Sequence, residues 1–171
     1  MVTLFSKLIG SEVISQSSSS KLGRIDNIVF DKENFTIAAI ILNKKFFFSP
    51  TKIIAASDLL ALSPDLILIR SDDSPVYIKE LPKLKQSLKS FPVGTGQKVV
   101  SYSSKKIGTA YDLLIDLDSK QIKSLYIHNF LDERIIPIST VIGFQKGVFI
   151  IKDEFSEIKI PSLSAELSDA K

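Results

Sequence analysis

The chain contains no cysteine and no tryptophan, and it has one histidine and one methionine in 171 residues. Without thiols it forms no disulfide and has neither a thiolate nucleophile nor a cysteine ligand for a metal. The longest uninterrupted apolar run is residues 37–42, whereas a membrane-spanning helix needs about 20 apolar residues. The first residues also lack the basic, apolar and small-residue succession of a signal peptide. We therefore expect a soluble protein of the cytoplasm.

The charge is balanced over most of the chain. The net charge is +3, and the whole excess falls in residues 75–95, where four lysines accompany a single glutamate. A dedicated nucleic-acid binder usually gathers basic residues over a domain face, because each neutralised phosphate releases counterions. Composition alone therefore gives little support to nucleic-acid binding outside that segment.

Residues with catalytic or metal-binding chemistry are sparse. His128 is the one histidine, and it falls at the start of a loop that also holds Asn129 and Asp132. General acid or base catalysis needs a titrating group that a partner orients, and no glycine-rich phosphate loop or Ser/His/Asp order accompanies this histidine. Four acidic residues could approach one another across two loops, but solvated loop charges are the simpler interpretation; they are Asp116, Asp118, Asp132 and Glu133. We expect no catalytic residue, no cofactor and no metal.

The strongest signal in the sequence is an internal duplication. Residues 21–31 reappear as residues 106–116 at a constant shift of 85, and the match continues through Ile37 and Ile122. It resumes at a shift of 82, from residues 53–54 against 135–136 onward to Ile69 against Ile151. A repeat of this length indicates one small domain present twice, because each copy is long enough to close its own core.

Each copy has the periodicity of β-strands. Residues 24–30 and 36–42 are short apolar or alternating runs, and they are separated by the turn residues 31–34. Asp31 and its equivalent Asp116 follow strands directly, where an aspartate side chain accepts backbone N–H bonds in a turn. Five or more short strands per copy favour a small antiparallel barrel, which removes exposed sheet edges by closing on itself.

Gly23 and Gly108 stand at the same place in the two copies. A residue without Cβ at the start of a strand permits a positive φ or a close backbone crossing. We interpret both glycines as conformational.

The predicted fold is all-β, with two tandem small antiparallel β-barrels joined by a short connector that contains a helix. Apolar side chains at helical spacing follow Pro82 in that connector. Phe155, Ile158 and Ile160 are expected to add a last strand or a packed extension, whereas the tail after them is polar. The predicted parts are a first barrel at 1–73, the connector at 74–93, a second barrel at 94–160 and a flexible tail at 161–171.

These residues resemble the PRC-barrel family, a module found in the photosynthetic reaction-centre H subunit and in the carboxy-terminal half of the ribosome maturation factor RimM. The resemblance rests on a glycine, a strand, an acidic turn, an isoleucine-rich strand and a later turn, and it covers residues 5–72 and about 94–153. Its pieces are residues 21–23, 57–59 and 64–65 with Asp31, and residues 106–108 and 136–139 with Asp112 and Asp116. The family resemblance implies a non-catalytic adaptor with protein partners, in a membrane-associated or ribosomal assembly.

Two segments contain residues that the core of a small barrel does not need. Phe46, Phe47 and Phe48 are consecutive, and a pleated strand alternates its faces, so at least one of the rings must leave the core. That ring is either covered by the connector or the other barrel, or it is an exposed anchor for a partner. Lys83, Lys85 and Lys89 line the polar faces of the connector, which is either a plain strap or a contact for RNA or a membrane surface.

We therefore predict a protein-interaction or assembly module, with the three phenylalanines and the three connector lysines as partner-binding residues. The alternative is an RNA-binding or ribosome-maturation factor, in which Lys79 and the three connector lysines contact phosphates. A third hypothesis is a ligand site between the barrels. Peripheral membrane association and a homo-oligomer stay open.

Overall fold

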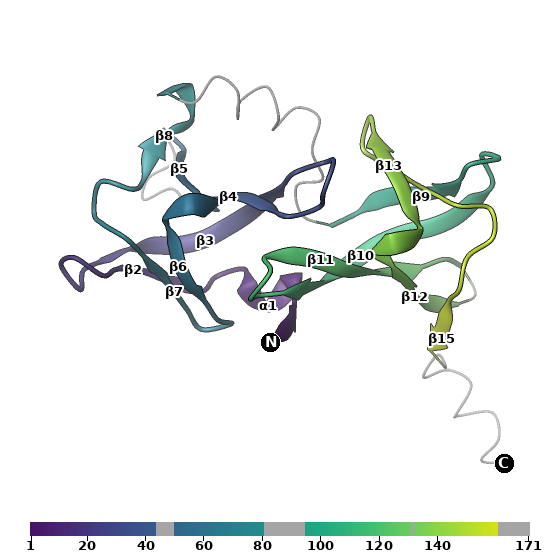
Figure 1. The fold of residues 1–171 in the computed structure, drawn as a ribbon, viewed down its shortest axis with the longest axis horizontal. Coiled ribbons are helices and arrows are strands. Elements are labelled where there is room, and N and C mark those ends of the chain that lie inside the picture. The colour runs from purple at the N-terminus through teal and green to yellow at the C-terminus, as the bar shows by residue number, and fades with distance from the viewer. Residues whose placement is uncertain (44–49, 81–94, 131, 161–171) are drawn as a thin grey trace, which may run out of the picture.

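The computed structural model describes residues 1–43, 50–80, 95–130 and 132–160. Its strands form two strongly curled sheets, one from each half of the chain (Figure 1). In these residues helix is limited to α1 (Phe5–Leu8) and three short 3-10 turns. None of the described helices has the length and apolar character that a membrane-spanning helix needs. The predicted mostly-β fold is confirmed.

The two sheets have the same strand order. We call the part that holds β2 to β8 the first module and the part that holds β9 to β15 the second module. The first sheet runs β6 (Leu59–Leu62), β7 (Leu66–Ile69), β2 (Glu12–Ser15), β3 (Lys21–Phe30), β4 (Ile37–Leu42), β5 (Lys52–Ala55) and β8 (Val76–Tyr77). The second runs β13 (Val141–Gln145), β14 (Val148–Ile151), β9 (Gln97–Ser101), β10 (Lys106–Asp116), β11 (Gln121–His128), β12 (Glu133–Pro137) and β15 (Ile158–Ile160).

Strand register repeats along with strand order. Ile28 faces Ile40 across β3 and β4, and Leu113 faces Leu125 across β10 and β11. Each of these ladders has a bulge at the equivalent place, between Ala110 and Asp112 in the second module and between the corresponding residues of the first. Because one residue of slippage would turn every side chain to the other face, this agreement confirms that the halves are duplicates.

Neither sheet is wholly antiparallel. β2 pairs with β7 in parallel, and β9 pairs with β14 in parallel, whereas the other named pairs run antiparallel. Each sheet is a curled half-barrel whose described strands end at β6 and β8, or at β13 and β15. The expectation of purely antiparallel barrels misses the parallel pair, because a parallel neighbour is joined through a long connection and leaves no hairpin signature in the sequence.

Apolar residues fill the concave side of each sheet. Ile28, Ile40 and Ile54 are fully buried in the first module, and Leu113 and Leu125 are their counterparts in the second. Each such side chain contributes roughly 1.5 to 3 kcal/mol through removal from water. The isoleucine-rich strands of the sequence therefore form the two cores.

Gly108 lies where two backbones come close together. A Cβ built at this position would be 2.5 Å from the carbonyl oxygen of His128 and 2.6 Å from the side chain of Ile127. Gly23, at the equivalent position, has a positive φ of 156°, a backbone conformation that glycine adopts readily. The interpretation of Gly108 as a close crossing is confirmed.

The module ends differ in detail from the expected ranges. β8 pairs with β5, so the first sheet includes Val76 and Tyr77, which the sequence analysis assigns to the connector. β15 pairs with β12, and this confirms the last predicted strand. The predicted connector helix and the tail at 161–171 lie outside the described residues.

The amino-terminal segment crosses to the second module. β1 (Val2–Leu4) pairs with the end of β10, Val2 opposite Asp116 and Leu4 opposite Leu114. α1 follows β1 directly and lies between the two sheets (Figure 1). The first residues of the chain therefore belong to the second sheet and link the modules.

Candidate binding surface between the two modules

The modules meet through equivalent residues. Thr36 forms a β-bridge with Gln121, and these positions differ by the same 85 residues that relate the repeats. The flanking hydrogen bonds are reciprocal: Ile37 N–H donates to Lys120 O at 2.7 Å, and Ile122 N–H donates to Phe35 O at 2.9 Å. The contact therefore has an approximate internal two-fold axis, as in an isologous dimer.

The residues before this bridge insert into the opposite module. Phe35 and Lys120 occupy equivalent positions and share a left-handed backbone, with φ 57° and 54°. Phe35 is buried, and its ring centroid lies 6.2 Å from that of Phe149 in the second core. A positive φ at a bulky residue is unfavourable, so the packing of this ring must offset it.

Lys120 extends in the opposite direction, from the second module to the first, and makes hydrogen bonds there. Its Nζ donates to the carbonyl oxygens of Ala56 at 3.1 Å and Leu59 at 2.9 Å, in the first module. Sequence reasoning missed this residue, because a lysine in a polar turn has the pattern of a solvated loop.

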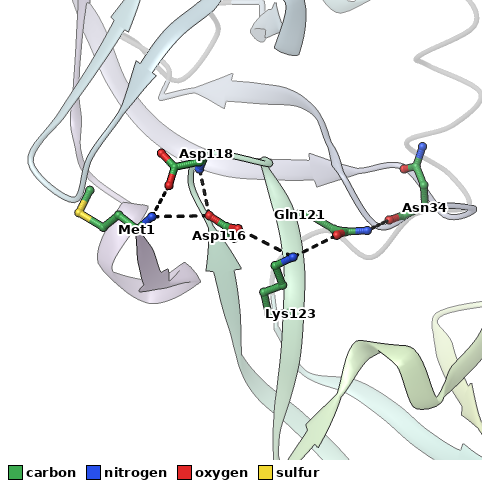
Figure 2. Close-up of polar contacts among 6 residues, drawn as sticks. All are labelled: Met1, Asn34, Asp116, Asp118, Gln121 and Lys123. Carbon is green, nitrogen blue, oxygen red and sulfur yellow. Dashed lines mark hydrogen bonds and ion pairs between the residues drawn. The ribbon is translucent and has the colours of Figure 1, made fainter.

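Figure 2 shows polar contacts that run along the second-module turn toward the first module. The amino group of Met1 contacts Asp118 and lies 3.7 Å from Asp116 Oδ1, while Lys123 Nζ lies 3.8 Å from Asp116 Oδ2. Mainly because the Asp118 N–H donates to it, Asp116 has a pKa below its ordinary value. The predicted turn role of Asp116 is confirmed.

The same contacts continue across the interface. Lys123 Nζ lies 3.4 Å from Gln121 Oε1, and Gln121 Nε2 donates to Asn34 O at 2.9 Å (Figure 2). Gln121 thus joins the first module through its side chain as well as its backbone.

Asp31, the equivalent of Asp116 in the first module, accepts the N–H of Glu33 in its own turn, as predicted.

α1 is fixed to the second module by a buried carboxylate. Asp112 is 5% exposed and accepts the Ser6 N–H at 3.1 Å and the Ser6 hydroxyl at 2.5 Å. A carboxylate that accepts several hydrogen bonds stabilises the segment that donates them. α1 also contacts the first sheet, because the ring centroid of its Phe5 lies 6.3 Å from that of Phe30 in β3.

A groove of about 480 Å³ lies at this junction. Asp26 of β3 and Tyr111 of β10 line it, and they are equivalent positions of the two repeats. The remaining lining comes from α1, the residues that follow it, β3 and the start of the second module: Phe5, Ser6, Ile9, Asn27 and Thr95. Both copies of the duplicated unit therefore contribute to one concave surface.

An aromatic cluster adjoins the groove at Tyr111. Its ring lies edge-on to Tyr126, with centroids 6.1 Å apart, and 5.7 Å from the ring of His128. The Tyr111 hydroxyl lies 3.4 Å from Glu133 Oε2, and burial together with that carboxylate raises the Tyr111 pKa. Tyr111 therefore stays a neutral hydroxyl, and it presents an apolar ring with a polar edge.

The charge of this surface is acidic. The described residues that line the groove include the carboxylate Asp26 and no lysine or arginine, and Glu133 lies beside the aromatic cluster. Such a surface attracts cationic or aromatic groups and opposes phosphates.

The predicted partner-binding residues are not among those that can be placed. Phe46, Phe47, Phe48, Lys83, Lys85 and Lys89 lie outside the described residues. The four acidic residues of the sequence analysis divide between two places. Asp116 and Asp118 lie at one end of β10 and β11, whereas Glu133, opposite His128, and the preceding Asp132 lie at the other end of β11. No set of three or more potential metal ligands occurs in the described part of the chain.

Comparison with known proteins identifies the domain. Residues 2–82 match the family model of the PRC-barrel domain, and no curated protein matches the chain. The first half therefore carries a PRC-barrel domain. The second half lies outside that match, but it repeats the strand order and register of the first. The resemblance noted from the sequence is confirmed for the first half.

Proposed function

We propose that this protein is a non-catalytic interaction or assembly module that binds a protein partner in the groove between its two modules. The observation that carries the proposal is the groove itself, which joins Asp26 and Tyr111 from the two repeats. The rings of Tyr126 and His128 contact Tyr111. Aromatic side chains beside a concave surface are typical of the residues that contribute most to protein binding.

The chemistry of the groove favours a polypeptide segment with apolar and cationic side chains. Ile9 and Tyr111 offer apolar surface, since 37% and 36% of these residues are exposed. Asp26, which lines the groove with Tyr111, and Glu133, at the Tyr111 hydroxyl, offer negative charge. An RNA backbone would place phosphates against these carboxylates, which costs binding energy. The connector lysines remain the predicted contacts for that alternative.

The experiment is affinity purification from the source cell with the wild type and two matched variants. Tyr111→Ser removes the ring at the groove, whereas Tyr102→Ser removes a 74%-exposed ring in the β9–β10 turn. A protein that is retained at high salt by the wild type and Tyr102→Ser, and lost with Tyr111→Ser, supports the proposal.

Two results contradict it. One is equal recovery of every partner by Tyr111→Ser and wild type. The other is recovery of RNA or ribosomal particles alone, released steeply as salt rises, because that slope is typical of phosphate contacts.

A further inference from the structure

A second cavity, of about 300 Å³, lies in the second module and has a different chemistry from the groove. Three basic residues, Lys105, Lys106 and Arg134, line it together with the single carboxylate Asp153. The Ser101 hydroxyl, in a residue 3% exposed, also lines it and lies 2.8 Å from the hydroxyl of Ser103. The cavity therefore joins the buried Ser101 hydroxyl and the exposed Ser103 hydroxyl with an excess of positive charge.

The first module shows which of these features the fold itself requires. Ser15 and Ser17 repeat the hydroxyl pair of the second module at 2.9 Å. Lys21 stands where the second module has Lys106, and it forms an ion pair with Glu12. The serine pair thus belongs to the duplicated framework, and in the first module the nearby lysine is neutralised.

The neutralising carboxylate is replaced by a lysine in the second module. Glu12 faces Arg24 across β2 and β3, and at the equivalent register Lys98 faces Thr109 across β9 and β10. In the described residues neither Lys105 nor Lys106 has an ion pair. Positive charges that gather without a counter-ion repel one another, and they raise the local concentration of anions.

The other charged groups at the cavity are already engaged. Arg134 is held by Asp132 at 3.1 Å and Glu157 at 2.9 Å, and its buried Nε has no hydrogen-bond partner in the described residues. Asp153 accepts the Ser103 N–H at 2.9 Å and interacts with the hydroxyls of Ser103 and Ser101, which together lower its pKa. The charge left for a ligand therefore comes from the two lysines.

We propose that this cavity binds a small anion with a phosphate group, held by Lys105 and Lys106. Lysine ammonium groups are charged hydrogen-bond donors for phosphate oxygens. A volume of about 300 Å³ is at the small end of ligand pockets, so the ligand is a small molecule. The site is separate from the partner-binding groove, and neither depends on the other.

The test is calorimetric titration of the full chain with inorganic phosphate and with glycerol phosphate, at near-physiological salt. Lys98→Glu restores the carboxylate that the first module has, and Lys105→Gln with Lys106→Gln removes the free charge. Matched controls make the same changes at exposed lysines elsewhere: Lys7→Glu, and Lys7→Gln with Lys32→Gln. Circular dichroism shows whether each variant is folded.

We expect wild type and both controls to bind at least one of the two compounds. Lys98→Glu and the double glutamine variant should weaken binding by about tenfold or more, as the loss of a charge-assisted hydrogen bond requires. Binding of glycerol phosphate alone identifies an organic phosphate as the ligand class. The proposal is overturned if the wild type binds neither compound, or if the site variants bind as well as the controls.

Discussion

Asn27 and Asp112 occupy the same bulge in the two modules, and each accepts the N–H of the next residue at 2.8 Å. Within the described residues, Asp112 also accepts the Ser6 N–H and hydroxyl, whereas Asn27 does not. Asn27 instead lines the groove. A duplicated turn feature has thus diverged, so that one copy fixes α1 and the other contributes to the candidate binding surface.

Asp112→Ala should destabilise the protein by about 2 to 3 kcal/mol, because the amides of Ser6 and Leu113 lose a buried acceptor. Asp112→Asn keeps the Oδ1 acceptor and should lose less than half as much. Urea unfolding followed by circular dichroism measures both changes. Equal losses in the two variants would mean that the hydrogen bonds to Oδ1 contribute little.

Phe35→Ala should weaken the junction of the modules by about 3 kcal/mol, a typical cost of removing a buried aromatic ring. Because Phe35 packs on Phe149 across the interface, the unfolding transition should also become broader or divide into two steps. Phe130→Ala, at a residue that is 100% exposed, is the control and should change stability by less than about 0.5 kcal/mol. Differential scanning calorimetry of the three proteins provides the comparison.

Gly108→Ala should destabilise the second module by about 2 kcal/mol or more, because the new Cβ would meet the backbone oxygen of His128 at 2.5 Å. Gly143→Ala is the matched control, since a Cβ there has no atom within 4 Å. Chemical denaturation should separate the two variants clearly. A Gly108→Ala protein as stable as Gly143→Ala would show that the two strands are farther apart than described here.

Acid should weaken the fold through Asp116. Its pKa is lowered in the folded protein, chiefly by the Asp118 N–H, so this stabilisation is present above the unfolded pKa of about 4 and is lost as the pH falls through the folded value. Asp116→Asn should show a shallower loss of unfolding free energy between about pH 5 and pH 2. Identical pH profiles for variant and wild type would exclude this contribution.

The sequence predicts the duplication and the strands well, because isoleucine-rich runs and turn aspartates such as Asp31 are local signals. It does not predict the parallel pair β2–β7, whose partners are far apart along the chain. Phe35 has the pattern of a turn residue, yet it completes the core of the other module. Such long-range contacts depend on how the two modules dock, and no local pattern specifies that.

The sequence analysis left open a ligand site between the two barrels but did not locate the candidate groove. Asp26 and Tyr111 are ordinary outward residues of two strands, and they come together only through the internal two-fold contact. The shift of 85 residues does identify them as equivalent positions. Duplicated domains often pair through equivalent surfaces. The shift of 85 residues was therefore the sequence signal that could have placed Asp26 and Tyr111 close together.

The docking of the two modules by equivalent residues is tested most directly by amide hydrogen exchange at Ile37 and Ile122. These amides donate to Lys120 O and Phe35 O across the interface. We predict that both are protected to a similar degree, and that both lose protection together in Phe35→Ala. Exchange of either amide as fast as that of the exposed turn residue Lys32 would contradict the account.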